Sequence, residues 1–203
     1  MNIEKILTRI GGVLSQPHKT FELMTVEGTS LGEGFLVSTL SLLALALSSA
    51  LTPQNSPVIL TFVFVLVFGL IALVTYLFAF FKIVESAYKA PGYFSEFLAI
   101  SSYALTPSVF PLAIISLMAV ISPIDPLIYM LFSLATGIVW FIWFNFLLYK
   151  ASQVYFKIDL KQFIIALFIS WVVLTVIIVV LALIFAALIS FILFFPYILA
   201  GGV

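Results

Sequence analysis

Long apolar runs separated by short polar stretches dominate the hydrophobic pattern of this chain. A helix needs roughly 20 mostly apolar residues to cross the hydrocarbon core of a membrane. Five runs reach that length, at about residues 31–51, 58–81, 97–121, 127–149 and 162–195. The pattern predicts an all-α fold in which residues 31–203 form a polytopic bundle of five transmembrane helices behind a tail, residues 1–30.

The fifth apolar run is longer than one perpendicular span requires. A sixth span would need a turn, and no proline or glycine lies between Lys161 and Phe195 to provide one. We therefore expect one long helix that tilts in the membrane or projects from it. An interfacial segment near residues 190–196 is a further expectation.

The basic residues indicate how the bundle is oriented, because Lys and Arg concentrate in cytoplasmic loops. Three lie in the tail, two follow the second run and three follow the fourth: Lys5, Arg9, Lys19, Lys82, Lys89, Lys150, Lys157 and Lys161. These are all eight basic residues of the chain. Five spans place them on one side of the membrane. We expect the N-terminus in the cytoplasm and the C-terminus outside.

The tail has a helical pattern of its own. Apolar residues recur at helical spacing at Ile3, Ile6, Leu7, Ile10, Val13 and Leu14, whereas Glu4, Lys5, Thr8 and Arg9 fall opposite. The pattern predicts a short amphipathic helix lying in the membrane interface. Packing of the same apolar face on the bundle is an equal alternative. Pro17 interrupts the pattern, and a second short helix is expected near residues 21–24.

Prolines predict where some of the runs end. Pro53 and Pro57 follow the first run. Ser122-Pro123-Ile124-Asp125-Pro126 predicts a tight turn between the third and fourth runs. In this interpretation Asp125 serves the turn and has no chemical role.

Composition agrees with a membrane protein and excludes several classes of function. The chain is 65% hydrophobic and 8% charged, whereas soluble domains carry about 25% charged residues. It has no cysteine, which excludes thiolate metal sites and a cysteine nucleophile. Net charge is zero without a basic block, so we expect no nucleic-acid partner. We expect no cofactor and no metal.

An enzymatic function has little support in the sequence. No HExxH, GxSxG, P-loop or GxGxxG motif is present. The one histidine, His18, lies in the tail. A catalytic site would have to combine His18 with Glu22 and Glu96, and we rank this possibility last.

Few polar side chains fall within or beside the predicted spans. Glu33 and Glu96 lie at the predicted cytoplasmic ends of the first and third spans, where capping of a helix N-terminus competes with ion binding. Asn145 is the one strongly polar side chain inside a span. We expect it to make an interhelical hydrogen bond.

The third run is the most irregular. After Ser101 it contains five candidate functional or packing positions: Ser102, Tyr103, Thr106, Pro107 and Pro111. Pro111 follows Pro107 by one helical turn. A proline removes a backbone hydrogen bond and favours a kink. A broken helix at membrane depth is typical of substrate sites in transporters. A kink that serves packing alone is the alternative.

Two segments resemble the Yip1-domain family of five-span membrane proteins. The first is Gly92-Tyr93-Phe94-Ser95-Glu96-Phe97-Leu98 followed by Ser102-Tyr103-Ala104-Leu105-Thr106-Pro107, which is similar to the second cytoplasmic segment and third span of that family. The second is Leu14-Ser15-Gln16-Pro17 followed by Phe21, which is similar to its opening segment. The predicted five-span layout matches across nearly the whole chain.

The resemblance implies an integral membrane protein of the Yip1 type. Eukaryotic Yip1-type proteins bind Rab GTPases and act in vesicle traffic. Their longer tail carries an Asp-Leu-Tyr-Gly-Pro-type motif that this chain lacks, and Ser102 stands where Gly is usual. The compact form resembles the prokaryotic branch, which implies a location in a prokaryotic plasma membrane.

Two functional hypotheses follow. The first is a non-enzymatic scaffold in membrane organisation or trafficking, in contact with membrane lipid, that binds a protein partner at the cytoplasmic face. The second is a small transporter or channel for a neutral or lipid-like solute, with a site near Tyr103, Thr106, Pro107 and Asn145.

Overall fold

The computed structural model describes residues 2–51, 58–120 and 126–199, and in these ranges it contains helices, short connections and no strand. The elements in chain order are α1 (Ile3–Ser15), α2 (Pro17–Glu27), α3 (Leu31–Leu51), α4 (Val58–Tyr88), α5 (Phe94–Ser101), the 3₁₀ helix η1 (Ser102–Ser108), α6 (Val109–Val120), α7 (Pro126–Phe156) and α8 (Leu160–Leu199). The all-α prediction is confirmed.

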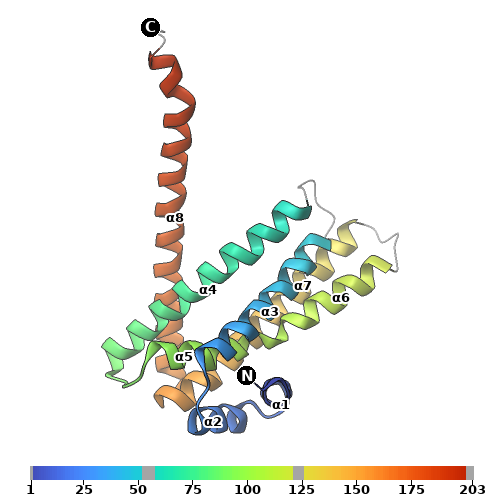
Figure 1. Ribbon diagram of the computed structural model, residues 1–203, viewed down its shortest axis with the longest axis vertical. Coiled ribbons are helices and arrows are strands. Elements are labelled where there is room, and N and C mark those ends of the chain that lie inside the picture. Colours follow the sequence, from blue (N-terminus) through green and yellow to red (C-terminus); the bar gives the residue numbers. More distant parts are fainter. Residues whose placement is uncertain (1, 52–57, 121–125, 200–203) are drawn as a thin grey trace.

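Five helical stretches of the described chain are long and apolar enough to cross a membrane, as the hydrophobic pattern predicted. They are α3, α4, the combination of α5, η1 and α6, then α7 and α8. Figure 1 shows α1, α2, the α4–α5 connection and the α7–α8 connection gathered at one end, which we name the N-terminal side. Every basic residue lies in these segments or within about two helical turns of them in α4, α7 or α8.

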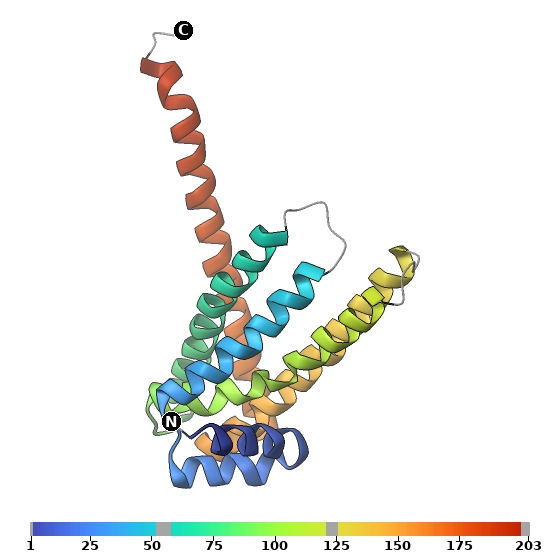
Figure 2. The same ribbon diagram turned by 45° about the vertical axis from the view of Figure 1, so that its right-hand side comes forward.

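The third span is the centre of the bundle. In its apolar window 67% of the residues are buried, against 17% in the windows of α4, α7 and α8. Two views that differ by a 45° turn show its segments running close beside α3 and α7 (Figures 1 and 2). The outer faces of α4, α7 and α8 expose large apolar side chains, which suits contact with lipid.

The helices α4 and α7 continue past the apolar runs that predicted them. They end at Tyr88 and Phe156, beyond the expected positions 81 and 149. Loss of hydrophobicity does not end a helix, and α4 continues through a Lys82–Glu85 ion pair of 2.7 Å. Each helix stops where a lysine takes a positive φ, 52° at Lys89 and 58° at Lys157, a backbone conformation typical of helix C-termini.

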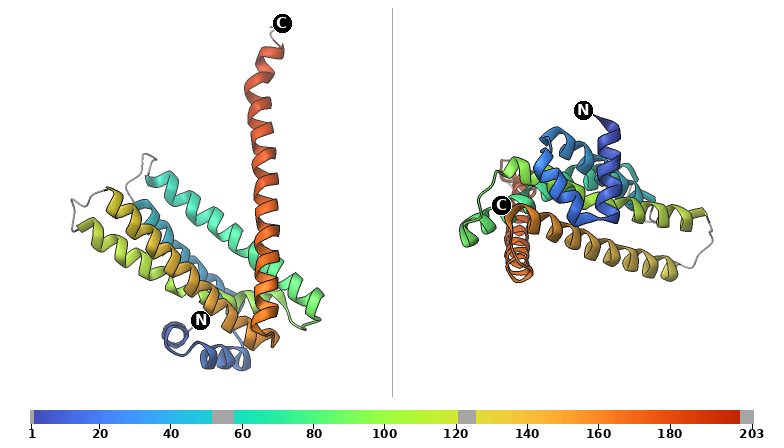
Figure 3. Two further views of the ribbon diagram at one scale, coloured as in Figure 1. Left: turned by 180° about the vertical axis from the view of Figure 1, so that it is seen from behind. Right: turned by 90° about the horizontal axis from the view of Figure 1, so that it is seen from below.

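The fifth span is one uninterrupted helix, as its sequence predicted. Helix α8 extends from Leu160 to Leu199, which corresponds to about 60 Å at 1.5 Å per residue. Figure 3 shows its later part diverging from the other spans and extending beyond them.

The tail forms a helical hairpin against the N-terminal side. Asn2 caps α1 by accepting from the Lys5 backbone N–H at 3.3 Å, and Pro17 occupies the first turn of α2. The two helices pack closely at Gly12, where a Cβ atom would lie 2.6 Å from the Thr20 hydroxyl. Helix α1 contacts η1 and α2 contacts α7 (Figure 2).

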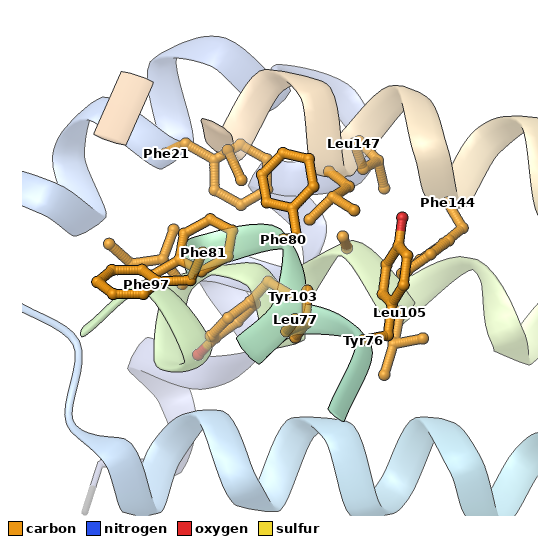
Figure 4. Close-up of a cluster of buried hydrophobic side chains, with 14 of the residues drawn as sticks. Phe21, Tyr76, Leu77, Phe80, Phe81, Phe97, Tyr103, Leu105, Phe144 and Leu147 are labelled. Atoms are coloured by element: carbon orange, nitrogen blue, oxygen red, sulfur yellow. The ribbon is translucent and has the colours of Figure 1, made fainter. Parts of the chain in front are cut away.

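A cluster of aromatic rings joins the spans near the N-terminal side. Phe97 of α5 lies 5.9 Å from Phe80 of α4 and 4.7 Å from Phe156 of α7, measured between ring centroids. Phe80 also meets Phe163 of α8 at 5.6 Å. Figure 4 shows Phe21 of the tail reaching the same core.

Two expectations lie outside the described residues. They are the end of the first run at Pro53 and Pro57 and the turn that contains Asp125.

Candidate functional site

A buried arginine joins the tail to the bundle. Arg9 of α1 is 6% exposed. Its Nη1 atom donates to Glu33 Oε1 at 2.7 Å, and its Nη2 atom donates to Glu27 Oε2 at 3.1 Å. Nη2 also donates to the Gly28 carbonyl at 3.1 Å, and Nη1 to Thr29 Oγ1 at 3.4 Å. One guanidinium therefore holds the end of α2, the α2–α3 connection and the start of α3.

Tyr103 extends this network into the third span. Its ring is fully buried in η1, and its hydroxyl donates to the same Glu33 oxygen that accepts from Arg9. Glu33 is thus shared by α1 and η1, and its side chain is 12% exposed. We name Arg9, Glu27, Glu33 and Tyr103 the tail–bundle network.

The charges of this network support one another. Burial by itself lowers the pKa of Arg9, but the hydrogen bonds and charge of Glu33 and the hydrogen bond to Glu27 outweigh it, so the pKa is raised. Hydrogen bonds from Lys5 and Arg9 lower the pKa of Glu27, which also forms an ion pair with Lys5 at 2.9 Å. A buried charge is stable only when it is paired in this way, so the cation and both carboxylates belong together.

Helical spacing alone placed Arg9 on the wrong face of α1. The expected polar face contained it, yet it is buried together with Ile6 and Val13. Those three residues follow the i, i+3, i+7 spacing of one helix face. This spacing could have placed Arg9 on the buried face, but the positions of the apolar residues alone assigned it to the polar face. Because carboxylates from distant segments compensate its charge, the guanidinium is buried where hydrophobicity would exclude it.

A close approach of two helices positions Glu33 beside Tyr103. A Cβ atom on Gly34 would lie 2.5 Å from Ala99 Cα and 2.8 Å from the Ala99 carbonyl oxygen. Only glycine allows α3 and α5 to approach this closely. The residue next to Gly34 is Glu33, so the contact holds its carboxylate within reach of η1.

A second polar cluster fixes the start of the third span. The Tyr155 hydroxyl of α7 accepts from the Tyr93 backbone N–H at 2.9 Å. It lies 2.9 Å from Glu96 Oε2 and 3.1 Å from the Tyr93 carbonyl, either of which can accept its proton. A Cβ atom on Gly92 would lie 2.7 Å from Tyr155 Cε1. The Gly92-Tyr93 pair and Glu96 therefore surround one tyrosine, which the sequence analysis did not identify.

The third span is interrupted where its sequence predicted irregularity. All seven residues of η1 are buried, and Pro107 lies inside it. A 3₁₀ segment of this length inside a span is uncommon and is typical of a hinge or a strained site. Ser102 Oγ donates to the Leu98 carbonyl at 2.7 Å, whereas Thr106 Oγ1 is buried without a hydrogen-bond partner among the described residues.

The remaining predicted positions lie apart from the tail–bundle network. Pro111 is buried in α6 and lines a cavity of about 230 Å³ together with Ser133 and Thr136 of α7. Asn145 Nδ2 donates to the Phe141 carbonyl of its own helix at 2.7 Å, and its Oδ1 is buried without a partner among the described residues. The interhelical bond expected from Asn145 is absent from that part of the chain.

Two of the three residues of the hypothetical catalytic site lie together, and the third contacts a residue outside it. His18 Nε2 lies 3.3 Å from Glu22 Oε1 on the exposed side of α2, and Glu96 contacts Tyr155. Among the residues that the structure describes, no group of three or more His, Cys, Asp or Glu side chains is placed to hold a metal ion.

Comparison with known proteins identifies the family. A family model for the Yip1 domain matches residues 11–184, which is most of the 203-residue chain. The chain belongs to the Yip1-domain family. The resemblance drawn from the Gly92–Pro107 and Leu14–Phe21 segments is thereby confirmed. No curated protein and no solved structure matches it.

The match places most of both polar clusters inside the Yip1 domain. Glu27, Glu33 and Tyr103 fall within residues 11–184, as does the cluster around Tyr155. Arg9 lies two residues before the matched range. The cation of the tail–bundle network therefore comes from the segment that precedes the matched domain.

Proposed function

We propose that this Yip1-domain protein is a non-enzymatic integral membrane scaffold whose N-terminal side faces the cytoplasm and binds a protein partner. The observation that carries the proposal is the tail–bundle network. It fixes a helical hairpin outside the spans by means of a buried ion pair between Arg9 and Glu33. A rigid surface loses less conformational entropy on binding than a mobile tail does.

The hairpin presents apolar side chains on this fixed frame. Leu7 of α1 is 63% exposed, and Val26 of α2 is 85% exposed. Ile3 and Leu23 are also exposed. A groove of about 590 Å³ runs between the two helices and is lined by Thr8, Met24 and other residues of both. Most residues that line the groove are polar or charged, and of the exposed apolar residues Leu23 is part of its lining. Exposed apolar side chains on the helices that form a groove favour a partner that contributes an apolar helix or loop.

The orientation in this proposal follows from charge. All eight basic residues lie on the side of the hairpin, and such an excess marks the cytoplasmic side of membrane proteins. The resemblance to the prokaryotic branch of the family favours a prokaryotic plasma membrane as the location. Because the chain has no cysteine, single cysteines introduced at Ser15 and at Ile59 provide the test. An impermeant maleimide should label Ile59→Cys on intact cells and Ser15→Cys only after the membrane is opened.

The scaffold function is tested by photo-crosslinking in native membranes with a surface variant of the hairpin. Leu7→Glu combined with Val26→Glu changes exposed side chains and leaves every residue of the tail–bundle network in place. We expect a discrete protein adduct with the unaltered chain and its loss with this variant.

Ser95→Glu is the matched control, because it adds a negative charge at an exposed position on the same side of the bundle. The control should retain the adduct. A partner that remains bound to the Leu7→Glu, Val26→Glu variant would exclude the hairpin as the binding surface.

A second candidate function is transport of a neutral solute, and one observation favours it. The cavity beside Pro111 lies between α3, α6 and α7 and is lined by the hydroxyl-bearing residues Ser48, Ser133 and Thr136. Ser133 Oγ has no partner within the described residues. Solute flux in liposomes that falls with Pro107→Ala and with Ser133→Leu would support this function. Flux no higher than in protein-free liposomes would exclude it, and protein-dependent flux that neither variant changes would exclude this cavity as the path.

A further inference from the structure

A second cavity lies between the spans and differs in chemistry from the first. It has a volume of about 270 Å³ and is partly open to the surface. Its lining comes from α3, α4, η1, α7 and α8, and includes Leu42, Val65, Ala72, Tyr76, Phe144 and Trp171. All of these residues belong to the apolar candidate spans. The solvent at its mouth is therefore lipid hydrocarbon.

One polar group of the cavity lining, the Tyr76 hydroxyl, has no hydrogen-bond partner in the described part of the chain. Tyr76 is 4% exposed, and its hydroxyl is buried and unpaired among the residues that the structure describes. Its ring lies against Trp171 of α8, with 5.4 Å between centroids. Figure 4 shows the Tyr76 hydroxyl directed toward α7 beside Phe144. A buried hydroxyl left without a partner costs stability, so its presence points to an acceptor that is supplied from outside the chain.

We propose that this cavity binds one acyl chain of a bilayer lipid and that the Tyr76 hydroxyl donates a hydrogen bond to the ester carbonyl of that lipid. The inference does not depend on the scaffold function. The lipid would occupy a defined site between helices, in contrast to the lipids that cover the outer faces of α4, α7 and α8.

The length and polarity of the cavity fit this occupant. Along α4 the lining extends from Val65 to Tyr76, which corresponds to about 16 Å of helix. Tyr76 marks the end toward the N-terminal side, and Lys82 follows it by about 9 Å along the same helix. The polar end of the cavity therefore lies near the membrane interface, where the ester groups of lipids are found, and the apolar end lies deeper.

Other occupants fit the cavity less well. Water needs two to four polar partners, and the lining contributes only the Tyr76 hydroxyl and the indole groups of Trp140 and Trp171. Of these, the Trp140 Nε1 atom already donates to Ser108 Oγ at 3.0 Å. A helix of a second copy is about 10 Å wide, which is more than a cavity of about 270 Å³ can admit.

The proposal is tested on the full chain reconstituted in vesicles of phosphatidylethanolamine and phosphatidylglycerol. A trace of each lipid carries a diazirine at the end of one acyl chain. After photolysis, the adducts are mapped by mass spectrometry of peptides. We expect adducts concentrated on the deep part of the cavity, near Val65 and Leu42, above the level on exposed residues such as Val179 of α8.

Three variants separate the cavity from the general lipid surface. Ala72→Phe fills the cavity and should reduce the adducts in it about tenfold. Val74→Phe is the matched control, because Val74 lies on α4, is exposed and does not line the cavity. Tyr76→Phe keeps the shape and removes the hydroxyl. It should reduce occupancy about fivefold, as expected for loss of one neutral hydrogen bond.

The same experiment can overturn the proposal. Adducts spread evenly over all exposed apolar faces, or cavity adducts that Ala72→Phe leaves unchanged, would exclude a defined acyl-chain site. Cavity adducts that survive Tyr76→Phe unchanged would exclude the hydrogen bond to the ester. If Ala72→Phe fails to fold, Val65→Phe fills the opposite end of the cavity and takes its place. The protein partner of the hairpin is measured separately, so a failure here leaves the scaffold proposal intact.

Discussion

Arg9 and Glu33 form an ion pair of 2.7 Å that joins the first helix of the chain to the first membrane span. Tyr103 donates to the same carboxylate from the interrupted third span. A displacement of the tail therefore changes the environment of Glu33, and through it that of η1. The hairpin and the centre of the bundle are mechanically connected by three side chains.

Replacement of Arg9 by alanine should destabilise the protein by about 3 kcal/mol, because it leaves a poorly hydrated Glu33 carboxylate without its cation. The measurement is the thermal unfolding of the purified protein in detergent. Arg9→Lys should restore only part of the loss, since lysine lacks the fork that contacts two carboxylates.

Lys82→Ala is the control for this experiment. Lys82 forms an exposed ion pair with Glu85 at 2.7 Å, and exposed pairs contribute about 0–1 kcal/mol. An Arg9→Ala effect no larger than that of Lys82→Ala would show that the buried pair does not hold the hairpin.

Tyr103→Phe should cost about 2 kcal/mol, because it removes a hydrogen bond to a charged acceptor in a buried site. The informative measurement is a double-mutant cycle with Arg9→Ala. Since both residues bind the same oxygen of Glu33, their effects should differ from additivity by more than about 0.5 kcal/mol. Strictly additive effects would contradict the shared network.

Gly34→Ala should destabilise the bundle, because the new Cβ atom would lie 2.5 Å from Ala99 Cα, and backbone cannot move aside cheaply. Gly32→Ala is the matched control on the same helix. Nothing lies within 4 Å of its Cβ position, so alanine there should be neutral or stabilise slightly through helix propensity. Thermal unfolding of the two variants side by side gives the comparison, and equal effects would contradict the close approach of α3 and α5.

Tyr155→Phe should release the start of the third span, because the Tyr93 backbone N–H and the Glu96 carboxylate lose their common partner. Faster amide hydrogen exchange at residues 93–97 is the expected result. Tyr129→Phe should have no such effect, since the Tyr129 hydroxyl is buried without a partner in the described part of the chain. Unchanged exchange in Tyr155→Phe would show that other contacts hold this segment.

The stability of the hairpin should fall at acid pH. Hydrogen bonds from Lys5 and Arg9 lower the pKa of Glu27 below its usual value of 4.5. A carboxyl group whose pKa is lower in the folded than in the unfolded state stabilises the fold when the pH is above the pKa of the unfolded state. This stabilisation is lost as the pH falls through the pKa of the folded state. Proteolysis between α1 and α3 should therefore be slow at about pH 6 and faster below about pH 4. Glu27→Gln should reduce this pH dependence, and an unchanged dependence would assign it to another group.

Most of the architecture could be predicted from the order of the residues. Five apolar runs predicted five spans, and Pro107 marked where the third is interrupted. The segments of the Yip1 resemblance fall where the chain is most constrained, since Gly92 and Glu96 surround Tyr155 and Tyr103 binds Glu33. These features are local or depend on hydrophobicity, so the sequence alone reveals them.

The helix ends and Arg9 were harder to predict for a physical reason. Helices α4 and α7 pass beyond the apolar runs because a helix can continue in water when side-chain pairs and packing support it. Arg9 was assigned to a polar face because an isolated guanidinium favours water. Its burial depends on Glu27 and Glu33, which lie 18 and 24 residues away in the chain.

The sequence by itself determined the class of protein, the number of spans and the side on which the positive charge gathers, since each depends on transfer of side chains between water and lipid. Only the tertiary structure decided which polar groups meet. Glu33 could cap a helix, bind an ion or form an ion pair, and the packing of Gly34 on Ala99 selects the last by holding Glu33 between Arg9 and Tyr103. Pairing of charges depends on distances of a few ångströms between remote segments, and the packing of backbone against backbone sets those distances.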